Sequence, residues 1–316
     1  MLFSTLLAAL TGASVVLGAP SLVKRQSNGT TPAASVNDTQ VLQFAMTLEL
    51  LENAFYTQGL QKFDQAAFEA AGYPFWVRNR FEQIAEHEAT HVDFLRAALG
   101  ADAVSACEYN FPLTDVKTFT AVSMALETTG QSAYMGAAAV LTDKNTLTTA
   151  ATILTVEARQ AAWVGSAVLK GPAWDGPFET PLGFNGVFSI ASQFLVSCPA
   201  SNPPLPVTNL TALTVNPAAP THGATVTLNF TQPANADSSS LFLAFLRGQS
   251  PVFAPIQSGG NGTFTATVPQ GLQGTIYAAV VSNNTAAATA DANLLTGLAM
   301  FEFPFDSFAN NNVTSS

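Results

Sequence analysis

Isolated glutamates stand in the middle of long segments that otherwise carry no charge. Residues 39–61 have Glu49 and Glu52 as their only charged residues, and residues 118–142 have only Glu127. A carboxylate on an apolar helix is costly to bury unless it is paired, protonated or bound to a cation. The sequence therefore predicts helices whose carboxylates converge in a shared interior.

Two further segments place ionisable groups on apolar helical faces. Between residues 145 and 169 the only acidic residue is Glu157. The segment 74–99 is rich in charge, but apolar residues recur along one of its faces at the helical spacing of three and four, and Glu88 and His91 fall on that face. The same interior is therefore expected to receive groups from all four segments.

The first and third segments repeat each other. MTLELLENAFY aligns with MALETTGQSAY at an offset of 78 residues, which pairs Glu49 with Glu127 and Tyr56 with Tyr134. Each of the two segments thus carries a glutamate followed seven residues later by a tyrosine. This repeat indicates that the helical region consists of two related halves.

The second and fourth segments repeat each other as well. The run from Glu88 to His91 aligns with the run from Glu157 to Gln160 at an offset of 69 residues. A single Glu-x-x-His is common by chance, whereas a duplicated arrangement on four apolar faces is much more specific. Each half therefore offers a Glu helix followed by a Glu-x-x-His or Glu-x-x-Gln helix.

Periodicity and end signals predict four long helices and a short fifth one. Pro74 suits a first helical turn and Gly100 suits a C-terminal cap. The link of about 15 residues between the second and third helices is long enough to run back along a bundle. The expected helices are Thr39–Gln61, Pro74–Leu99, Asp115–Leu141, Lys144–Leu169 and Gly186–Val196.

The pattern resembles the ferritin-like di-metal carboxylate proteins, in which two helices each give a Glu and two others each give a Glu-x-x-His. It is most similar to a secreted fungal ferritin-like family described as stress-response or sexual-development proteins, and more distantly to plant desiccation-related proteins. The resemblance covers residues 36–198 and implies a mainly α, ferritin-like four-helix bundle there. The stretches that carry it are LELLENAFY, EHEATHVDFL, ACEYNFPLTDVKTF, SAYMGAAA and ILTVEARQAAW.

The resemblance also implies a site for an iron or manganese pair. Gln160 departs from the family pattern, which has a second histidine there, and an amide is a poorer ligand for iron than imidazole. Glu52 is either a ligand or a partner of one. Tyr56 and Tyr134 match positions that hydrogen-bond ligand carboxylates. The implied metal ligands are Glu49, Glu88, His91, Glu127 and Glu157.

Two functions stay open from the sequence. The first is redox protection under stress, by oxidation of the metal or removal of peroxide, which would make the protein a metal-dependent oxidoreductase. The second is non-enzymatic: a glycosylated cell-wall or extracellular structural or interaction protein, in which the same side chains form a vestigial site or a hydrogen-bonded network. Analogy of fold does not separate the two.

The amino-acid composition of the chain changes beyond residue 203. Residues 203–316 contain one Arg and no Lys, and short alternating segments are separated by turn residues. We expect a linker at 199–207 and an Ig-like antiparallel β-sandwich at 208–316. No catalytic cluster is visible there, so a partner-binding role, such as cell-wall association, is the hypothesis for this region. The expected strands are Ala224–Phe230, Leu241–Phe245, Gly262–Val268 and Thr275–Val281.

The N-terminus predicts export. Residues 1–19 contain an apolar run of signal-peptide length, and residues 20–25 end in Lys24-Arg25, which looks like a fungal processing dipeptide. In an oxidising compartment the chain's two cysteines, Cys107 and Cys198, are expected to form one disulfide.

Glycosylation sequons also support export, and the net charge bears on possible partners. A net charge of −10 argues against a nucleic-acid partner, because binding to phosphates needs a basic surplus. No later run is long and apolar enough for stable membrane insertion. Seven Asn-x-Ser/Thr sequons are expected to be glycosylated, at Asn28, Asn37, Asn209, Asn229, Asn261, Asn283 and Asn312.

Overall fold

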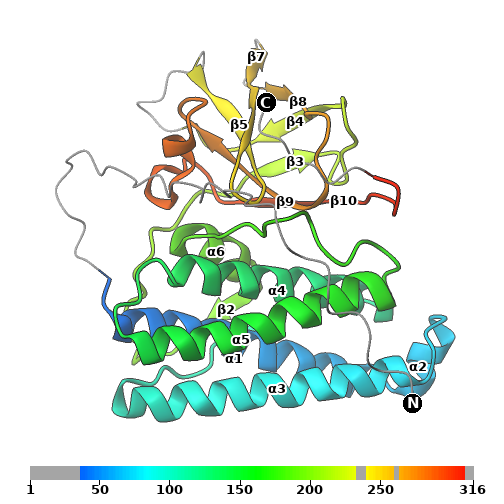
Figure 1. The fold of residues 1–316 in the computed structure, drawn as a ribbon, viewed down its shortest axis with the longest axis vertical. Helices are drawn as coiled ribbons and strands as arrows, with labels where there is room; N and C mark the ends of the chain where they lie inside the picture. Colours follow the sequence, from blue (N-terminus) through cyan, green and yellow to red (C-terminus); the bar gives the residue numbers. More distant parts are fainter. Residues whose placement is uncertain (1–35, 233–239, 260–262, 310–316) are drawn as a thin grey trace, which may run out of the picture. The chain divides into compact units, whose positions relative to one another are not determined.

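The computed structural model describes residues 36–232, 240–259 and 263–309 (Figure 1). The predicted signal peptide and pro-segment lie outside the described residues, as do the sequons at Asn28, Asn261 and Asn312. Each of the other four sequon asparagines is exposed to solvent: Asn37, Asn209, Asn229 and Asn283.

Four long helices make up the first part of the described chain, as the hydrophobic periodicity predicts (Figure 1). They pack as two pairs, α1 with α3 and α4 with α5, and α1 also contacts α4. Within the described residues no helix is long and apolar enough to cross a bilayer. The helices are α1 (Asp38–Lys62), α2 (Gln65–Ala70), α3 (Trp76–Leu99), α4 (Val116–Ala137), α5 (Lys144–Trp163) and α6 (Phe184–Ala191).

Side-chain caps determine where three of the long helices begin. The Asn37 side chain accepts from the backbone N–H of Gln40, whose own side chain accepts from the Asn37 backbone, so that α1 starts with a capping box. Asp115 and Asp143 accept from backbone N–H groups in the first turns of α4 and α5. Each such cap stabilises its helix by about 1 kcal/mol.

Several helix ends differ from the sequence prediction. The third long helix ends at Ala137 rather than at Leu141, which follows a turn and packs in a core cluster. The second begins at Trp76 rather than at Pro74, whereas the fourth continues past Trp163 as a π-helix, Val164–Val168, to within one residue of its predicted end at Leu169. The short α2 was not predicted, because six residues give too little periodicity for a pattern to stand out.

The predicted fifth helix is wrong in its second half. It ends at Ala191, and Leu195–Ser197 forms a strand, β2, that pairs antiparallel with β1 (Glu108–Tyr109). A disulfide joins Cys107, directly before β1, to Cys198, directly after β2. The end of the segment therefore pairs with a strand far away in sequence, which local periodicity does not reveal.

The C-terminal part consists of two four-stranded antiparallel sheets. One has the strand order β10-β9-β5-β6 and the other β3-β4-β8-β7. Side chains from both sheets meet in one core, which contains Leu228 of β4, Phe264 of β8 and Ile276 of β9. The strands are β3 (Thr214–Asn216), β4 (Thr225–Asn229), β5 (Phe242–Leu246), β6 (Val252–Pro255), β7 (Gln257–Gly259), β8 (Thr263–Thr267), β9 (Gly274–Val281) and β10 (Ala299–Phe303).

The strand β9 is buried on both of its faces. Ile276, Ala278 and Val280 point into the core between the sheets, whereas Tyr277 and Ala279 belong to the core of the helical region. This explains why its sequence, GTIYAAVV, is continuously apolar while TVTLN of β4 alternates. The sheet that contains β9 therefore lies between the helices and the outer sheet.

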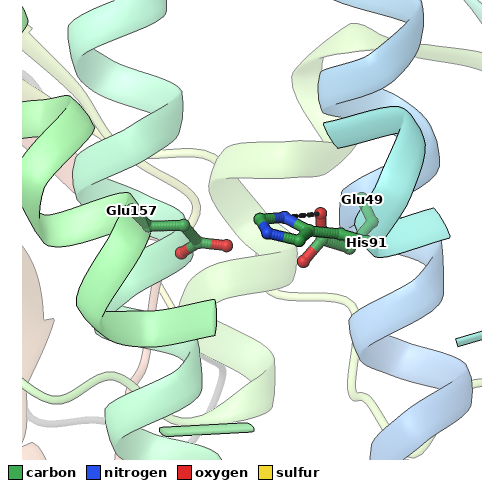
Figure 2. Close-up of side chains that lie close together, drawn as sticks. All are labelled: Glu49, His91 and Glu157. Carbon is green, nitrogen blue, oxygen red and sulfur yellow. Dashed lines mark hydrogen bonds and ion pairs between the residues drawn. The ribbon is translucent and has the colours of Figure 1, made fainter. Parts of the chain in front are cut away.

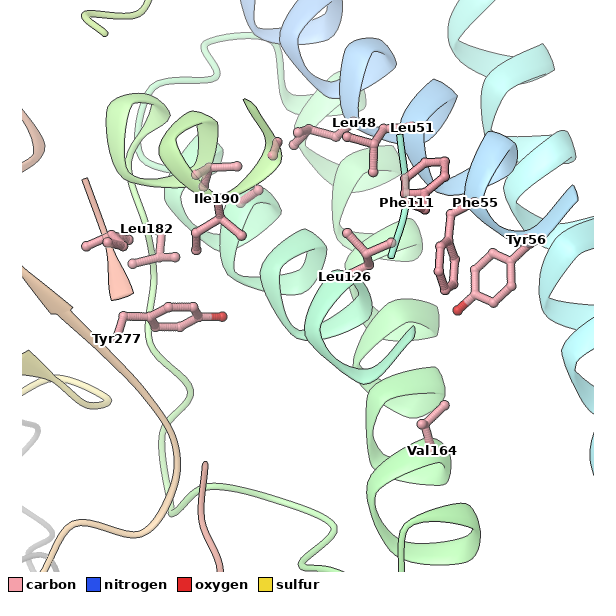
Figure 3. Close-up of a cluster of buried hydrophobic side chains, with 14 of the residues drawn as sticks. Leu48, Leu51, Phe55, Tyr56, Phe111, Leu126, Val164, Leu182, Ile190 and Tyr277 are labelled. Carbon is pink, nitrogen blue, oxygen red and sulfur yellow. The ribbon is translucent and has the colours of Figure 1, made fainter. Parts of the chain in front are cut away.

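The helical and β parts share one hydrophobic core cluster. Tyr277 lies beside Leu182 and Ile190 in this cluster (Figure 3), and its hydroxyl donates to the backbone oxygen of Thr128 on α4 at 3.1 Å. The helical region and the antiparallel sheets that follow it agree with the expected fold class. The Ig-like assignment and the domain boundaries at 198 and 208 stay predictions.

Candidate metal centre

The four long helices bring their isolated carboxylates to one level of the bundle. Figure 2 shows Glu157 of α5 pointing toward His91 of α3 and Glu49 of α1. All five glutamates are at most 4% exposed, and His91 is partly buried. The buried glutamates are Glu49 and Glu52 on α1, Glu88 on α3, Glu127 on α4 and Glu157 on α5.

Two overlapping groups of these side chains have the spacing of metal ligands. Ligand atoms of Glu49, His91 and Glu157 lie within 4.8 Å of one another, and so do carboxylate oxygens of Glu49, Glu52 and Glu88. Glu49 belongs to both groups. Glu127 lies in neither group, and its Oε1 accepts a hydrogen bond from Tyr56 instead.

His91 links the carboxylates of two helices. Its Nδ1 lies 3.2 Å from Glu49 Oε2 and 3.2 Å from Glu88 Oε2. Burial alone would lower the pKa of His91, but the hydrogen bonds to Glu49 and Glu88 outweigh burial and raise it to about 10. In the absence of metal, this histidine is therefore a cation that holds two carboxylates together.

The two tyrosines exchange hydrogen bonds between the halves of the repeat. Tyr134 of α4 donates to Glu49 Oε1 of α1 at 2.5 Å, and Tyr56 of α1 donates to Glu127 Oε1 of α4. Tyr56 also shares a hydrogen bond of 2.8 Å with the hydroxyl of Ser123. Each tyrosine thus orients the glutamate of the other half, and the two bonds connect α1 with α4 in both directions.

Gln160 also bonds across the bundle. Its Nε2 donates to Glu88 Oε1 at 3.0 Å and lies 3.4 Å from the Nδ1 of His87. Its Oε1 is buried and has no hydrogen-bond partner among the described residues. The amide therefore presents a free oxygen where the family pattern has an imidazole.

The cluster has more acceptors than donors. Among the described residues, both carboxylate oxygens of Glu157 and the Oε2 of Glu127 are buried without a partner. Burial, reinforced by repulsion from neighbouring carboxylates, raises the pKa of Glu52, Glu127 and Glu157 well above the usual range. Burial likewise raises the pKa of Glu88, to about 7. Without a cation, some of these groups must be protonated.

Gly130 is a site residue that the sequence prediction missed. A Cβ atom at this position would lie 2.6 Å from Glu157 Oε2 and 3.0 Å from Glu52 Oε1. The glycine therefore makes room for two carboxylates beside α4. A glycine inside a helical pattern, three residues after Glu127, was the available signal, because it costs helix stability and usually has a packing reason.

The donor set fits a hard or borderline cation. Oxygen ligands with one imidazole suit Mn(II) and Fe(II), whereas thiolate-binding metals would need cysteine. The chain's two cysteines are joined to each other in the disulfide. The residues present are therefore able to hold a metal ion, with Glu49, His91 and Glu157 as one ligand group.

Comparison with known proteins agrees with this arrangement. Residues 37–170 match the family described as ferritin-like domain. The chain is also similar to Protein rds1 of Schizosaccharomyces pombe, with 29% identity over 226 residues, which are 67% of this chain and 54% of the relative. It thus spans about half the length of that relative. The helices, the buried carboxylates and these matches agree that residues 37–170 are similar to ferritin-like domains.

Proposed function

We propose that the ferritin-like domain binds a pair of iron or manganese ions through its buried carboxylates. We further propose that the protein is exported and glycosylated, because it has a predicted signal peptide and several sequons. Its proposed role is redox protection, by oxidation of the metal or removal of peroxide. The proposed ligands are Glu49, Glu88, His91, Glu127 and Glu157, with Glu52 and Gln160 as further candidates.

The observation that carries this proposal is the set of buried oxygens that have no hydrogen-bond partner in the described part of the chain. They belong to Glu127, Glu157 and Gln160, and all of them are acceptors. A cluster that served only for hydrogen bonding would leave few such atoms, because each unsatisfied group costs about 1–3 kcal/mol. A cation satisfies several acceptors at once and offsets their mutual repulsion.

The chain's own side chains would prepare this site for its ions. Bound iron or manganese would supply one-electron redox chemistry. Tyr56 and Tyr134 hold the carboxylates of Glu127 and Glu49 in fixed orientations. His91 must lose a proton before a ring nitrogen can bind a metal, so we expect metal binding to release protons.

Aromatic side chains close one end of the site. Phe55, Phe81 and Phe119 are fully buried, and the ring of Phe119 packs against Tyr56 and Phe81. These rings exclude water from the side of Glu127 that Tyr56 approaches. A dry environment strengthens every charge interaction in the cluster.

The alternative proposal is a non-enzymatic extracellular or cell-wall protein with a vestigial site. It is favoured by the hydrogen bonds of His91 and the two tyrosines, which already satisfy part of the cluster. In that case the β region, with its exposed sequons at Asn209, Asn229 and Asn283, would carry the function by binding a partner.

Calorimetric titration with Mn(II), Zn(II) and, without oxygen, Fe(II) tests the proposal. We expect saturable binding that Glu127→Ala weakens and Gln160→His tightens for iron. Glu86→Gln, at an exposed position of α3, serves as the matched control and should bind as the wild type does. Elemental analysis of the protein from its native secretion identifies the metal. Absence of saturable binding to the wild type would favour the alternative.

A further inference from the structure

A cavity of about 520 Å³ lies beside the α4–α5 pair, apart from the carboxylate cluster. Its walls come from α4, α5, the π-helix, residues 171–179 and β10. None of the proposed metal ligands is among its lining residues. The volume is in the range of small-molecule binding sites, which are commonly apolar with a few polar groups.

Most of the cavity wall is apolar and consists of small side chains. Alanines on α4 and α5, among them Ala125, Ala158 and Ala162, leave the space that larger residues would fill. Gly165 of the π-helix also lines it, and a Cβ there would lie 2.9 Å from the backbone oxygen of Pro172. The irregular helix thus lets the 171–179 segment approach closely, as π-helices often do near binding sites.

One part of the wall carries three acidic side chains, Asp175, Glu179 and Glu302. Asp175 Oδ1 accepts from the backbone N–H of Thr275 at 2.7 Å, and the Thr275 hydroxyl donates to Glu302 at 2.8 Å. Gln131 Nε2 lies 3.4 Å from Glu179 Oε2. Among the described residues that line the cavity there is no Lys, Arg or His. The acidic groups therefore face the cavity without a cationic neighbour in its wall.

The pairing of these carboxyl groups is electrostatically unfavourable. Burial, and then the charge of Glu179, raises the pKa of Asp175 to about 8, and burial also raises the pKa of Glu302. A cation placed among the three groups would relieve this repulsion. A bare metal ion would leave the apolar walls unused, and an anionic ligand would add to the negative charge.

We propose that this cavity binds an apolar amine, with its hydrocarbon part against the alanines of α4 and α5 and its ammonium group among Asp175, Glu179 and Glu302. Trp174 lines the cavity and is 58% exposed, so its fluorescence can report on a ligand bound there. The proposal is independent of the metal site, because the two share no proposed ligand residue.

Titration with octylamine, octanol and octanoate tests both parts of the proposal, because the three share one tail and differ in head group. We expect saturable octylamine binding in calorimetry with a change in Trp174 fluorescence. Octanol should bind at least about tenfold more weakly, since it lacks the charge-assisted hydrogen bonds, and octanoate should not bind. Equal binding of all three, or no binding of octylamine, would overturn the proposal.

Variants of the lining residues test whether octylamine binds in this cavity. Glu179→Gln should weaken octylamine binding about tenfold, and Ala162→Phe should remove it by filling the cavity. Glu86→Gln should change nothing, and Trp174→Phe should keep the calorimetric signal while losing the fluorescence response. Circular dichroism melts check that each variant is folded. If Ala162→Phe does not fold, Glu179→Gln decides: unchanged octylamine affinity in that variant would refute the assignment.

Discussion

Replacing Glu157 with glutamine should stabilise the metal-free protein and reduce its stabilisation by metal. Glu157 is fully buried, and neither of its carboxylate oxygens has a partner among the described residues. Burial, followed by repulsion from Glu52 and Glu49, raises its pKa well above the usual range. Glutamine has nearly the same shape, carries no charge to desolvate, and has an amide N–H that can donate to a neighbouring carboxylate.

The expected size follows from the partners that Glu157 lacks. An unsatisfied buried polar group costs about 1–3 kcal/mol, and 1 kcal/mol shifts the melting temperature of a chain of this length by about 1.5–2 °C. The metal-free variant should therefore melt several degrees above the wild type. With free metal at about 100 times Kd, the wild type gains about 2.7 kcal/mol, whereas the variant gains less because one ligand is lost.

Thermal melts of both proteins, in chelator and in Mn(II), measure these effects. The order of stability should favour the variant in chelator and shift toward the wild type in metal. Glu86→Gln controls for loss of a negative charge on an exposed helix face. A variant that melts below the wild type in chelator would show that the Glu157 carboxylate is well satisfied as it stands. An unchanged metal-dependent gain would show that Glu157 is no ligand.

Three further predictions test other parts of the structure. Gly130→Ala should weaken metal binding in calorimetry by about tenfold, because its Cβ would displace the Glu157 carboxylate; unchanged affinity would show that the carboxylate can move aside. Asp175 has a pKa of about 8 in the folded protein, near Glu179 and Glu302, so folded chains keep a proton that unfolded chains lose and stability falls as pH rises from about 4 to 8. Asp175→Asn should flatten this fall, by up to about 1.4 kcal/mol per pH unit in denaturant titrations, and an unchanged slope would contradict the assignment. The fragment 28–200 should stay helical by circular dichroism but melt cooperatively below the full chain, because β9 no longer covers the helices; aggregation of the fragment would show that the sheet is required for folding.

The positions of the carboxylates were predictable from sequence, whereas their partners were not. A glutamate on an apolar helix must be buried, so Glu49 and Glu127 could be singled out without a structure. The repeat shows Tyr56 seven residues after Glu49 on the same helix, which suggests that both serve one half. In the structure Tyr56 bonds to Glu127 instead. Which glutamate a tyrosine contacts depends on how the helices pack across the bundle. The periodicity of a single helix carries no information about that packing.

In the β region, too, the sequence revealed some strands and missed others. The alternating segment of β4 and the apolar run of β9 were recognisable from their own patterns, whereas β10, which also has five residues, was not predicted. The strands β3 and β7 have three residues each, and β6 contains a proline. Such segments are strands because longer neighbours offer them hydrogen bonds, so their existence follows from the sheet and not from their own composition.

The repeat is symmetric in its tyrosines and asymmetric in its Glu-x-x-His and Glu-x-x-Gln helices, and this asymmetry has a consequence for the site. Glu88 receives hydrogen bonds from both His91 and Gln160, whereas the oxygens of Glu157 receive none among the described residues. The acceptor oxygens without a partner are therefore concentrated at Glu157, in the ligand group that also contains the imidazole. The other group, which shares Glu49, offers only carboxylates. Two ions bound here would meet unequal ligands, and we expect the position between His91 and Glu157 to be the tighter one.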